Sequence, residues 1–260
     1  MRCKTAAVAI VWSLLASTHA KAGPADNLVE DVGRGLLVDW STLMVEVEAG
    51  SYRAGAQATK AVEQSARLAI DDRLEAGLGV VRVAPDVLVS DLLDDEDLSG
   101  SLEARRSRWR VSEAVYTVSG KVDLRAQLSL QEFLKPYTLK RARPTPPHGE
   151  ASSHTGVLID ARGLGAQPAY LPALLGPDGA PLWQGEMWDE DAVSAAPVVW
   201  VPDPSHPAAA RAGDRPLLLT ASSASGAEIT LEAGAAAALR ALLDAEAVAR
   251  GRVVIVSDPL

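Results

Sequence analysis

The chain has 260 residues, of which 48% are hydrophobic, 23% are charged and only 4% are aromatic. This length predicts one or two domains, and the composition is that of a globular protein, which excludes wholesale disorder and collagen-like repeats. The formal net charge of −9 argues against a nucleic-acid binder that relies on bulk electrostatic attraction. The chain has one cysteine and no recurring Cys or His spacing, which excludes zinc ribbons and disulfide scaffolds.

The N-terminus is typical of a secretory signal peptide over residues 1–22. Arg2 begins a positive segment, an apolar run follows over residues 5–17, and the small residue Ala22 ends a cleavage motif. The apolar run is too short to span a bilayer. Cys3 precedes this run, whereas a lipoprotein carries its cysteine after it. We therefore expect cleavage near Ala22 and a periplasmic or secreted mature protein with no transmembrane segment.

Residues 141–153 form the clearest break in composition along the mature chain. Prolines and small polar residues dominate this stretch, and they disfavour both helices and sheets. We interpret the stretch as a linker between one domain over residues 23–140 and a second domain over residues 154–260.

The first domain is predicted to combine a small sheet with one long helix. Apolar residues at alternate positions predict a strand from Trp40 to Glu48, which Gly50 closes. Apolar residues at helical spacing, with charges on the opposite face, predict an Ala-rich helix over residues 54–76. The other expected elements are a bent edge strand over 80–89, an acidic loop over 91–97, antiparallel strands over 105–116 and 118–128, and a short helix over 129–134.

The second domain is predicted to contain short apolar strands and one Ala-rich helix. The expected elements are a buried strand from Thr155 to Asp160, a hairpin over 174–183, strands over 198–201 and 217–221, a helix over 231–250 and a final strand over 252–257. The predicted fold class is therefore α+β. It has two small domains, each with a mostly antiparallel sheet and one long Ala-rich helix packed on it.

Two stretches resemble known exported proteins. The layout of the first domain, which ends in Gly-Lys-Val-Asp-Leu-Arg-Ala-Gln-Leu over residues 120–128, resembles the LPP20-like envelope-protein family and the N-terminal domain of the flagellar T-ring family FlgT. The second half, from Thr-Gly-Val-Leu-Ile-Asp-Ala-Arg-Gly-Leu at Thr155, is similar to a domain that often accompanies it. LPP20-like proteins are often lipoproteins, whereas this chain has no lipobox cysteine. The resemblance implies a non-enzymatic protein with other envelope proteins as partners, and it carries over no catalytic residue.

No motif in the sequence predicts a catalytic centre, a metal site or a cofactor. The Gly-x-Ser-x-Gly and His-Glu-x-x-His motifs are both absent. Ser152 or Ser153, His154 and Asp160 could form a triad on paper, but the serines fall in the predicted linker, and a triad requires preorganised geometry. The acidic run over residues 94–97 lacks the ligand spacing of a calcium loop, so we interpret it as solvated.

Asp160, Arg162 and Gly163 are the first candidate binding residues. Asp160 and Arg162 lie two positions apart at the end of a predicted strand, so their side chains are expected on the same side. The planar guanidinium could bind a carboxylate or a phosphate ligand. Alternatively, the two side chains pair with each other or with backbone groups and hold the turn that follows. An open cleft lined by them would favour ligand binding, whereas mutual pairing would favour the structural role.

Arg106, Arg108 and Arg110 are the second set of candidates. On the predicted strand over residues 105–116 they share one face, with Trp109 on the other. Such a face could bind an anionic polymer or an acidic partner. The alternative is a solvated sheet face on which acidic neighbours pair with the arginines.

The sequence thus predicts an exported, non-enzymatic protein that is a structural or accessory component of a cell-envelope assembly, for which a flagellar-type machine is one candidate. It predicts no nucleic-acid partner. The alternative is a periplasmic ligand-binding or hydrolytic domain that uses the Asp160–Arg162 turn on a cell-wall fragment.

Overall fold

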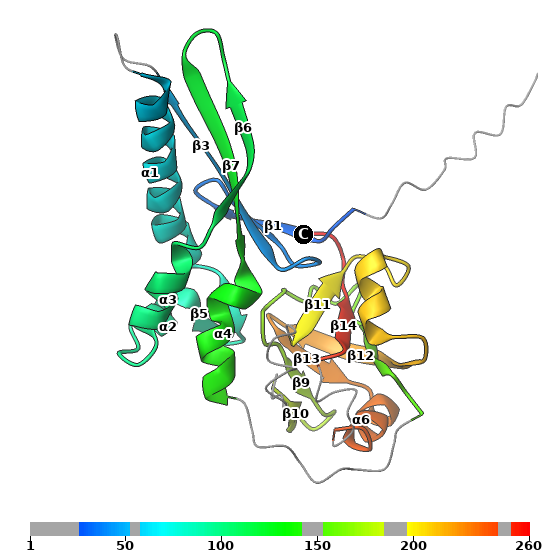
Figure 1. Ribbon diagram of the computed structural model, residues 1–260. Helices are drawn as coiled ribbons and strands as arrows, with labels where there is room; N and C mark the ends of the chain where they lie inside the picture. The colour runs from blue at the N-terminus through cyan, green and yellow to red at the C-terminus, as the bar shows by residue number, and fades with distance from the viewer. Residues whose placement is uncertain (1–25, 53–57, 142–152, 185–196, 244–250) are drawn as a thin grey trace, which may run out of the picture.

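The computed structural model describes residues 26–52, 58–141, 153–184, 197–243 and 251–260. Helices and two main sheets make up this part of the chain, so the α+β class is confirmed (Figure 1). The predicted signal peptide, and most of the predicted linker over residues 141–153, lie outside the described residues. None of the described helices is both long and apolar enough to cross a membrane.

The first sheet has the strand order β1-β2-β3-β7-β6, and every neighbouring pair is antiparallel. Its strands are β1 (Val29–Gly33), β2 (Leu36–Asp39), β3 (Met44–Tyr52), β6 (Arg110–Tyr116) and β7 (Lys121–Ser129). The prediction that Gly50 closes the third strand is wrong, because pairing with β7 continues through Gly50 to Tyr52. β6 and β7 form a long hairpin that projects beyond the rest of the sheet (Figure 1).

Helix α1 (Thr59–Leu78) packs on one face of the first sheet, mainly against β3 and β7. The predicted apolar stripe is buried at Val62, Ala66, Ile70 and Leu74. Near the end of α1, Gly77 lies so close to β2 that a Cβ atom there would be 2.8 Å from the Leu36 side chain. The absence of a side chain at Gly77 therefore allows the helix to approach the sheet closely.

The segment between α1 and β6 differs from the prediction. β4 (Arg82–Ala84) and β5 (Val87–Leu88) form a two-stranded antiparallel sheet in place of one bent strand. Helix α2 (Val89–Leu93) includes the first residues of the predicted acidic loop, residues 94–98 form a loop as expected, and α3 (Ser99–Arg106) replaces the start of the predicted strand over 105–116. These short helices form because they bury apolar side chains against the core at Val89, Leu92 and Leu102.

After β7, helix α4 (Leu130–Arg141) is longer than the predicted helix over 129–134. It contains Pro136 in its interior and buries Phe133, Leu134 and Tyr137 on the side that faces the core. Burial of this face outweighs the usual cost of a proline within a helix.

The second sheet has the order β10-β9-β13-β12-β8-β14-β11. Its strands are β8 (Gly156–Asp160), β9 (Ala173–Leu175), β10 (Pro181–Trp183), β11 (Val198–Val201), β12 (Pro216–Ser225), β13 (Glu228–Leu231) and β14 (Val253–Val256). The expectation of a mostly antiparallel sheet is wrong here, because only β9–β10 and β12–β13 are antiparallel and the other pairs are parallel. β14 and β11 are buried along their whole length, as strands of parallel sheets usually are.

Two short helical segments accompany the second sheet. The 3-10 helix η1 (Pro207–Ala212) packs on β8, β11 and β14, and α6 (Ala233–Arg240) contacts β10 and β12. The Ala-rich helix begins later than the predicted Leu231, because that residue still pairs in β13. The end of the predicted helix, up to residue 250, lies outside the described residues.

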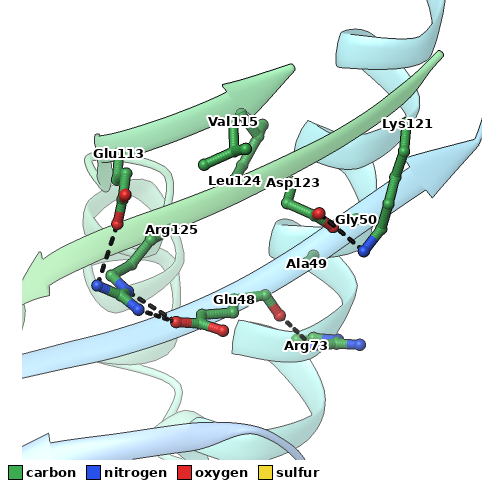
Figure 2. A pocket seen from close by; sticks show the side chains of 10 residues that line it. All are labelled: Glu48, Ala49, Gly50, Arg73, Glu113, Val115, Lys121, Asp123, Leu124 and Arg125. Carbon is green, nitrogen blue, oxygen red and sulfur yellow. Dashed lines mark hydrogen bonds and ion pairs between the residues drawn. The ribbon is translucent and has the colours of Figure 1, made fainter. Parts of the chain in front are cut away.

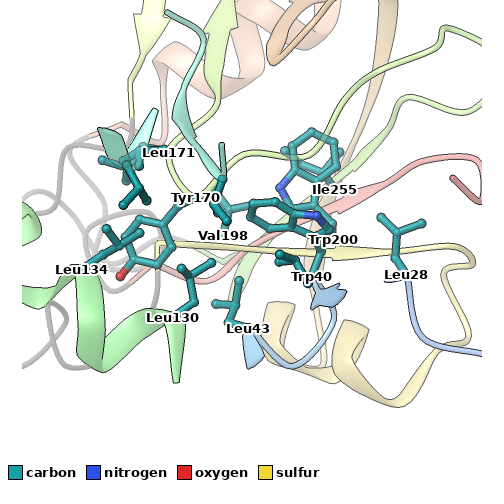
Figure 3. Packing of buried hydrophobic residues seen from close by; sticks show 14 of the residues in the cluster. Leu28, Trp40, Leu43, Leu130, Leu134, Tyr170, Leu171, Val198, Trp200 and Ile255 are labelled. Carbon is teal, nitrogen blue, oxygen red and sulfur yellow. The ribbon is translucent and has the colours of Figure 1, made fainter. Parts of the chain in front are cut away.

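The two halves of the chain share one hydrophobic core. Trp40 and Leu130 from the first half pack with Tyr170 and Trp200 from the second half (Figure 3). Backbone hydrogen bonds cross the same boundary, from Trp200 N–H to Trp40 O (3.2 Å) and from Leu171 N–H to a carbonyl of β4 (2.6 Å). We call this boundary the seam. Packing and hydrogen bonds across the seam hold the two halves together, in addition to the covalent chain between them.

Candidate functional site

The turn that the sequence singles out follows the carboxyl end of β8. β12, β8, β14 and β11 are parallel, so their carboxyl ends meet at one edge of the second sheet, where open α/β sheets commonly bind ligands. Asp160 is the last residue of β8, and Arg162 and Gly163 follow it. Gly163 has a φ angle of 75°, which glycine adopts without strain, and its N–H donates to Asp258 Oδ2 at 2.6 Å.

Asp160 and Arg162 are paired with each other. Arg162 Nε and Nη2 donate to the two carboxylate oxygens of Asp160 at 2.9 and 2.5 Å. These hydrogen bonds hold the pKa of Asp160 below its ordinary value, and the carboxylate raises the pKa of Arg162. The two side chains are 39% and 43% exposed. Because Asp160 already fills the guanidinium fork, this arrangement favours the structural role over ligand binding.

The three candidate arginines do not share a strand face. Arg106 is the last residue of α3, Arg108 lies in the turn that follows, and Arg110 begins β6. Arg106 forms an ion pair with Glu75 of α1 at 3.1 Å. The shared face expected from the sequence is therefore wrong, because the chain is helical up to Arg106 and has no strand alternation there.

The remaining sequence candidates are not gathered into a reactive group. Asp160 bonds to Arg162, and Ser152 lies outside the described residues. Within the described ranges, no cluster of three or more His, Cys, Asp and Glu residues could hold a metal ion. The acidic residues Asp95 and Asp97 instead pair with Lys140 of α4 at 3.2 and 3.1 Å.

A hollow of about 440 Å³ lies on the first sheet, on the face opposite α1 (Figure 2). Its lining residues come from β3, β6, β7 and α1, and they are Glu48, Ala49, Gly50, Arg73, Glu113, Val115, Lys121, Asp123, Leu124 and Arg125. Gly50 opens space at the centre, where a Cβ atom would collide with the Asp123 carboxylate. Ligand pockets commonly have volumes of a few hundred Å³, so the hollow is large enough for a peptide side chain or a small molecule.

The charged groups in the hollow are paired across the strands. Arg125 donates to Glu48 Oε1 at 2.7 Å and lies 3.1 Å from Glu113 Oε2, so one guanidinium serves two carboxylates. Lys121 Nζ lies 2.7 Å from Asp123 Oδ2. The hydrogen bond that Arg125 donates to Glu48 raises the pKa of Arg125, and the one that Lys121 donates to Asp123 raises the pKa of Lys121. Arg73, from α1, donates to the backbone carbonyl of Glu48.

Aromatic and aliphatic side chains lie beside these charges. Tyr52, at the end of β3, is 69% exposed, and Lys121 Nζ lies 5.5 Å from the centre of its ring. Val115 of β6 lines the hollow and is 45% exposed. Alternating charges next to exposed apolar groups can make contacts with another molecule, and such polar and aromatic mixtures are typical of binding surfaces.

This hollow was not predicted from the sequence. Its residues come from four separate elements and share one face only because of the cross-strand register of β3, β7 and β6. The alternation over residues 121–127 was the available signal, because it places Lys121, Asp123 and Arg125 on the side away from the core.

Comparison with known families covers less than half of the chain. Residues 156–259 match the family model described as Treponema pallidum Tp0624, second domain. The match begins with the first residue of β8 and extends beyond β14, so it includes the whole second sheet. No curated protein matches the chain. The resemblance of the first half to the LPP20-like and FlgT families stays a prediction, and the second half is similar to the second domain of Tp0624.

Proposed function

We propose that this chain is an exported, non-enzymatic protein that serves as a structural or accessory component of a cell-envelope assembly, with a flagellar-type machine as one candidate. Its partners are other envelope proteins, and its contact surface is the face of the first sheet that carries the hollow.

One observation carries the proposal. The part of the first sheet formed by β3, β7 and β6 presents paired charges and exposed apolar side chains on the face opposite α1 (Figure 2). A rigid sheet buried on one face and open on the other suits protein contact. Its charged groups are already paired, so they are poorly placed to act as acid, base or nucleophile.

The alternative function at the Asp160–Arg162 turn has less support. A ligand carboxylate or phosphate at Arg162 would have to displace Asp160 from two hydrogen bonds. Replacing one carboxylate by another in a half-exposed site gains little free energy. A cell-wall ligand would be favoured by an open cleft with an unoccupied guanidinium. At this turn the guanidinium is instead hydrogen-bonded to Asp160.

Site-specific photo-crosslinking in the native envelope tests the proposed function. A photoreactive phenylalanine analogue at Tyr52, next to the hollow, is expected to capture one or a few envelope proteins reproducibly. The matched control carries the same analogue at Leu139, an exposed residue of α4. Equal yields from the two positions, or capture by neither, would contradict the proposal.

A further inference from the structure

β6 is an edge strand of the first sheet. It is the last strand in the sheet order, and within the described residues it pairs with β7 alone. Free strand edges expose N–H and C=O groups that can pair with another strand, so proteins often protect them with prolines, lysines or bulges. The bulge in β6 lies between Val111 and Glu113, and the stretch from Ala114 to Thr117 has neither proline nor lysine.

The same stretch exposes apolar side chains. Val115 is 45% exposed, Tyr116 is 52% exposed, and Val118 at the tip of the hairpin is fully exposed. The hairpin projects from the molecule, so no other described element lies beyond this edge (Figure 1). An exposed, regular and apolar strand edge is the feature that most favours pairing between chains.

The backbone direction of each residue follows from the hairpin. Thr117 N–H donates to Lys121 O at 2.9 Å, so Thr117 directs its backbone groups toward β7. Alternate residues of an antiparallel strand face the same neighbour, so Val115 also faces β7. Ala114 and Tyr116 therefore direct their N–H and C=O groups to the free edge.

We propose that this edge pairs with the same edge of a second copy of the chain, antiparallel about a two-fold axis at Val115. In this register Ala114 lies opposite Tyr116 of the second copy, and their outward backbone groups form the new ladder. Glu113 lies opposite Thr117 of the second copy, and the two valines lie opposite each other. The two five-stranded sheets then form one continuous sheet.

The register favours a second copy because the edge is complementary to itself, as a two-fold interface requires. A small alanine faces a large tyrosine, and no like charges are opposite. Shifting the axis to Glu113 would place two carboxylates opposite each other, which destabilises a strand pair. The contact involves few residues, so the dimer is expected to be weak and to form at high protein concentration. This inference does not depend on the proposed envelope function.

A cysteine substitution tests the register directly. The two Val115 residues would be a non-hydrogen-bonded pair with Cα atoms about 4.5 Å apart, a separation that a disulfide can bridge. In the full chain with Cys3→Ser, Val115→Cys is expected to give a disulfide-linked dimer under mild oxidation. Val80→Cys is the matched control, because Val80 is 51% exposed and lies in the turn after α1. Equal crosslinking of the two variants would overturn the proposal.

A charge substitution tests the dimer without a crosslink. Val115→Lys places two ammonium groups opposite each other at the axis, and it is expected to weaken association about tenfold or more. Val80→Lys should associate like the unchanged chain. Sedimentation velocity over a range of concentrations measures the association, and circular dichroism checks that each variant is folded. An unchanged chain that stays monomeric at every concentration, or equal effects of the two lysines, would also overturn the proposal.

Discussion

At the scale of single residues, two buried serines differ in the hydrogen bonds that their hydroxyl groups make. Ser41 lies in the seam, where its Oγ donates to Trp200 O and accepts from Leu28 N–H, both at 2.9 Å. Ser257 follows β14 and is equally buried, but its Oγ has no hydrogen-bond partner among the described residues. A buried hydroxyl without a partner lowers the stability of the folded state, whereas a bonded one supports it.

We predict opposite effects for the same substitution at these two positions. Ser41→Ala leaves two buried backbone groups without a partner and should lower the free energy of unfolding by about 1–3 kcal/mol. Ser257→Ala removes an unpaired polar group and should leave the free energy of unfolding unchanged or raise it. Urea unfolding of both variants measures the difference. Equal losses for the two variants would mean that Ser41 does not act through these hydrogen bonds.

Tyr170 predicts how stability changes at alkaline pH. Its ring is buried in the shared core, and burial raises its pKa from about 10 to about 12. The folded state therefore favours the neutral phenol, and this contribution is complete below about pH 10. As the pH rises toward 12, the unfolded state loses its proton first, and about 2–3 kcal/mol of stability is lost.

The substitution Tyr170→Phe removes this ionisation. The variant should lose less stability between about pH 10 and 12 than the unchanged chain, in urea unfolding followed at each pH. Tyr52→Phe is the control, because Tyr52 is largely exposed and its substitution should leave the alkaline loss intact. Parallel curves for Tyr170→Phe and the unchanged chain would assign the alkaline loss to other groups.

The candidate residues could be predicted only where local spacing decides the geometry. Asp160 and Arg162 are two positions apart at the end of a strand, which predicts side chains on the same side, and Arg162 does donate a hydrogen bond to Asp160. Arg106 and Arg108, which precede β6, were predicted on the same strand as Arg110, because no apolar alternation marks the boundary between α3 and β6. The ion pair of Arg106 with Glu75 joins two elements that are distant in sequence, and no local pattern encodes it.

At the scale of the elements, the contact of α1 with β2 depends on Gly77. A Cβ atom at this position would lie 2.8 Å from the Leu36 side chain. On α3, a Cβ atom at Gly100 would meet nothing within 4 Å. Alanine is the better helix former, by about 1 kcal/mol in a helix interior, so the surroundings decide the sign of each substitution.

We predict that Gly77→Ala destabilises the protein and that Gly100→Ala does not. The new methyl at position 77 must displace Leu36 or the helix, and overpacking of this kind costs about 1–3 kcal/mol, which exceeds the gain in helix propensity. Gly100→Ala should raise the free energy of unfolding by up to about 1 kcal/mol. Thermal and urea unfolding of the pair test this, and a stabilising Gly77→Ala would show that α1 can move away from β2.

Long periodic elements were predictable, and strand pairing was not. The helix α1 and most strands of the second half lie close to the predicted positions, because each has a regular apolar pattern. The parallel pairing of β8, β14 and β11 was missed, although continuous apolar runs such as Val253–Val256 are typical of strands buried on both faces. The order of strands in a sheet depends on contacts far apart in sequence, which short apolar runs do not specify.

At the scale of the whole molecule, the seam makes the two halves interdependent. The outer edge of β11 is hydrogen-bonded to the backbone of the first half, because Trp200 N–H donates to Trp40 O. The Trp40 and Trp200 rings are fully buried (Figure 3). We predict a single cooperative unfolding transition for the chain, because exposing this core would destabilise both sheets.

Trp40→Ala tests the coupling. Removing this side chain should lower the free energy of unfolding by about 3–5 kcal/mol, as for other large aromatic truncations. Signals from the two halves should report the same loss of stability. Hydrogen exchange at β7 and at β14, for example, should increase in both strands. Two separated transitions in the unchanged chain would show that the halves unfold independently and that the seam contributes little.

The seam also has a consequence for how the chain can be divided. Its contacts hold β4 against the segment before β9 and the loop after β2 against β11, without using the covalent connection between α4 and β8. We therefore expect the halves to keep their arrangement without the peptide connection between α4 and β8. One polypeptide that ends after α4 and a second that begins before β8 should associate and form the same shared core. The protein should therefore be suited to fragment complementation.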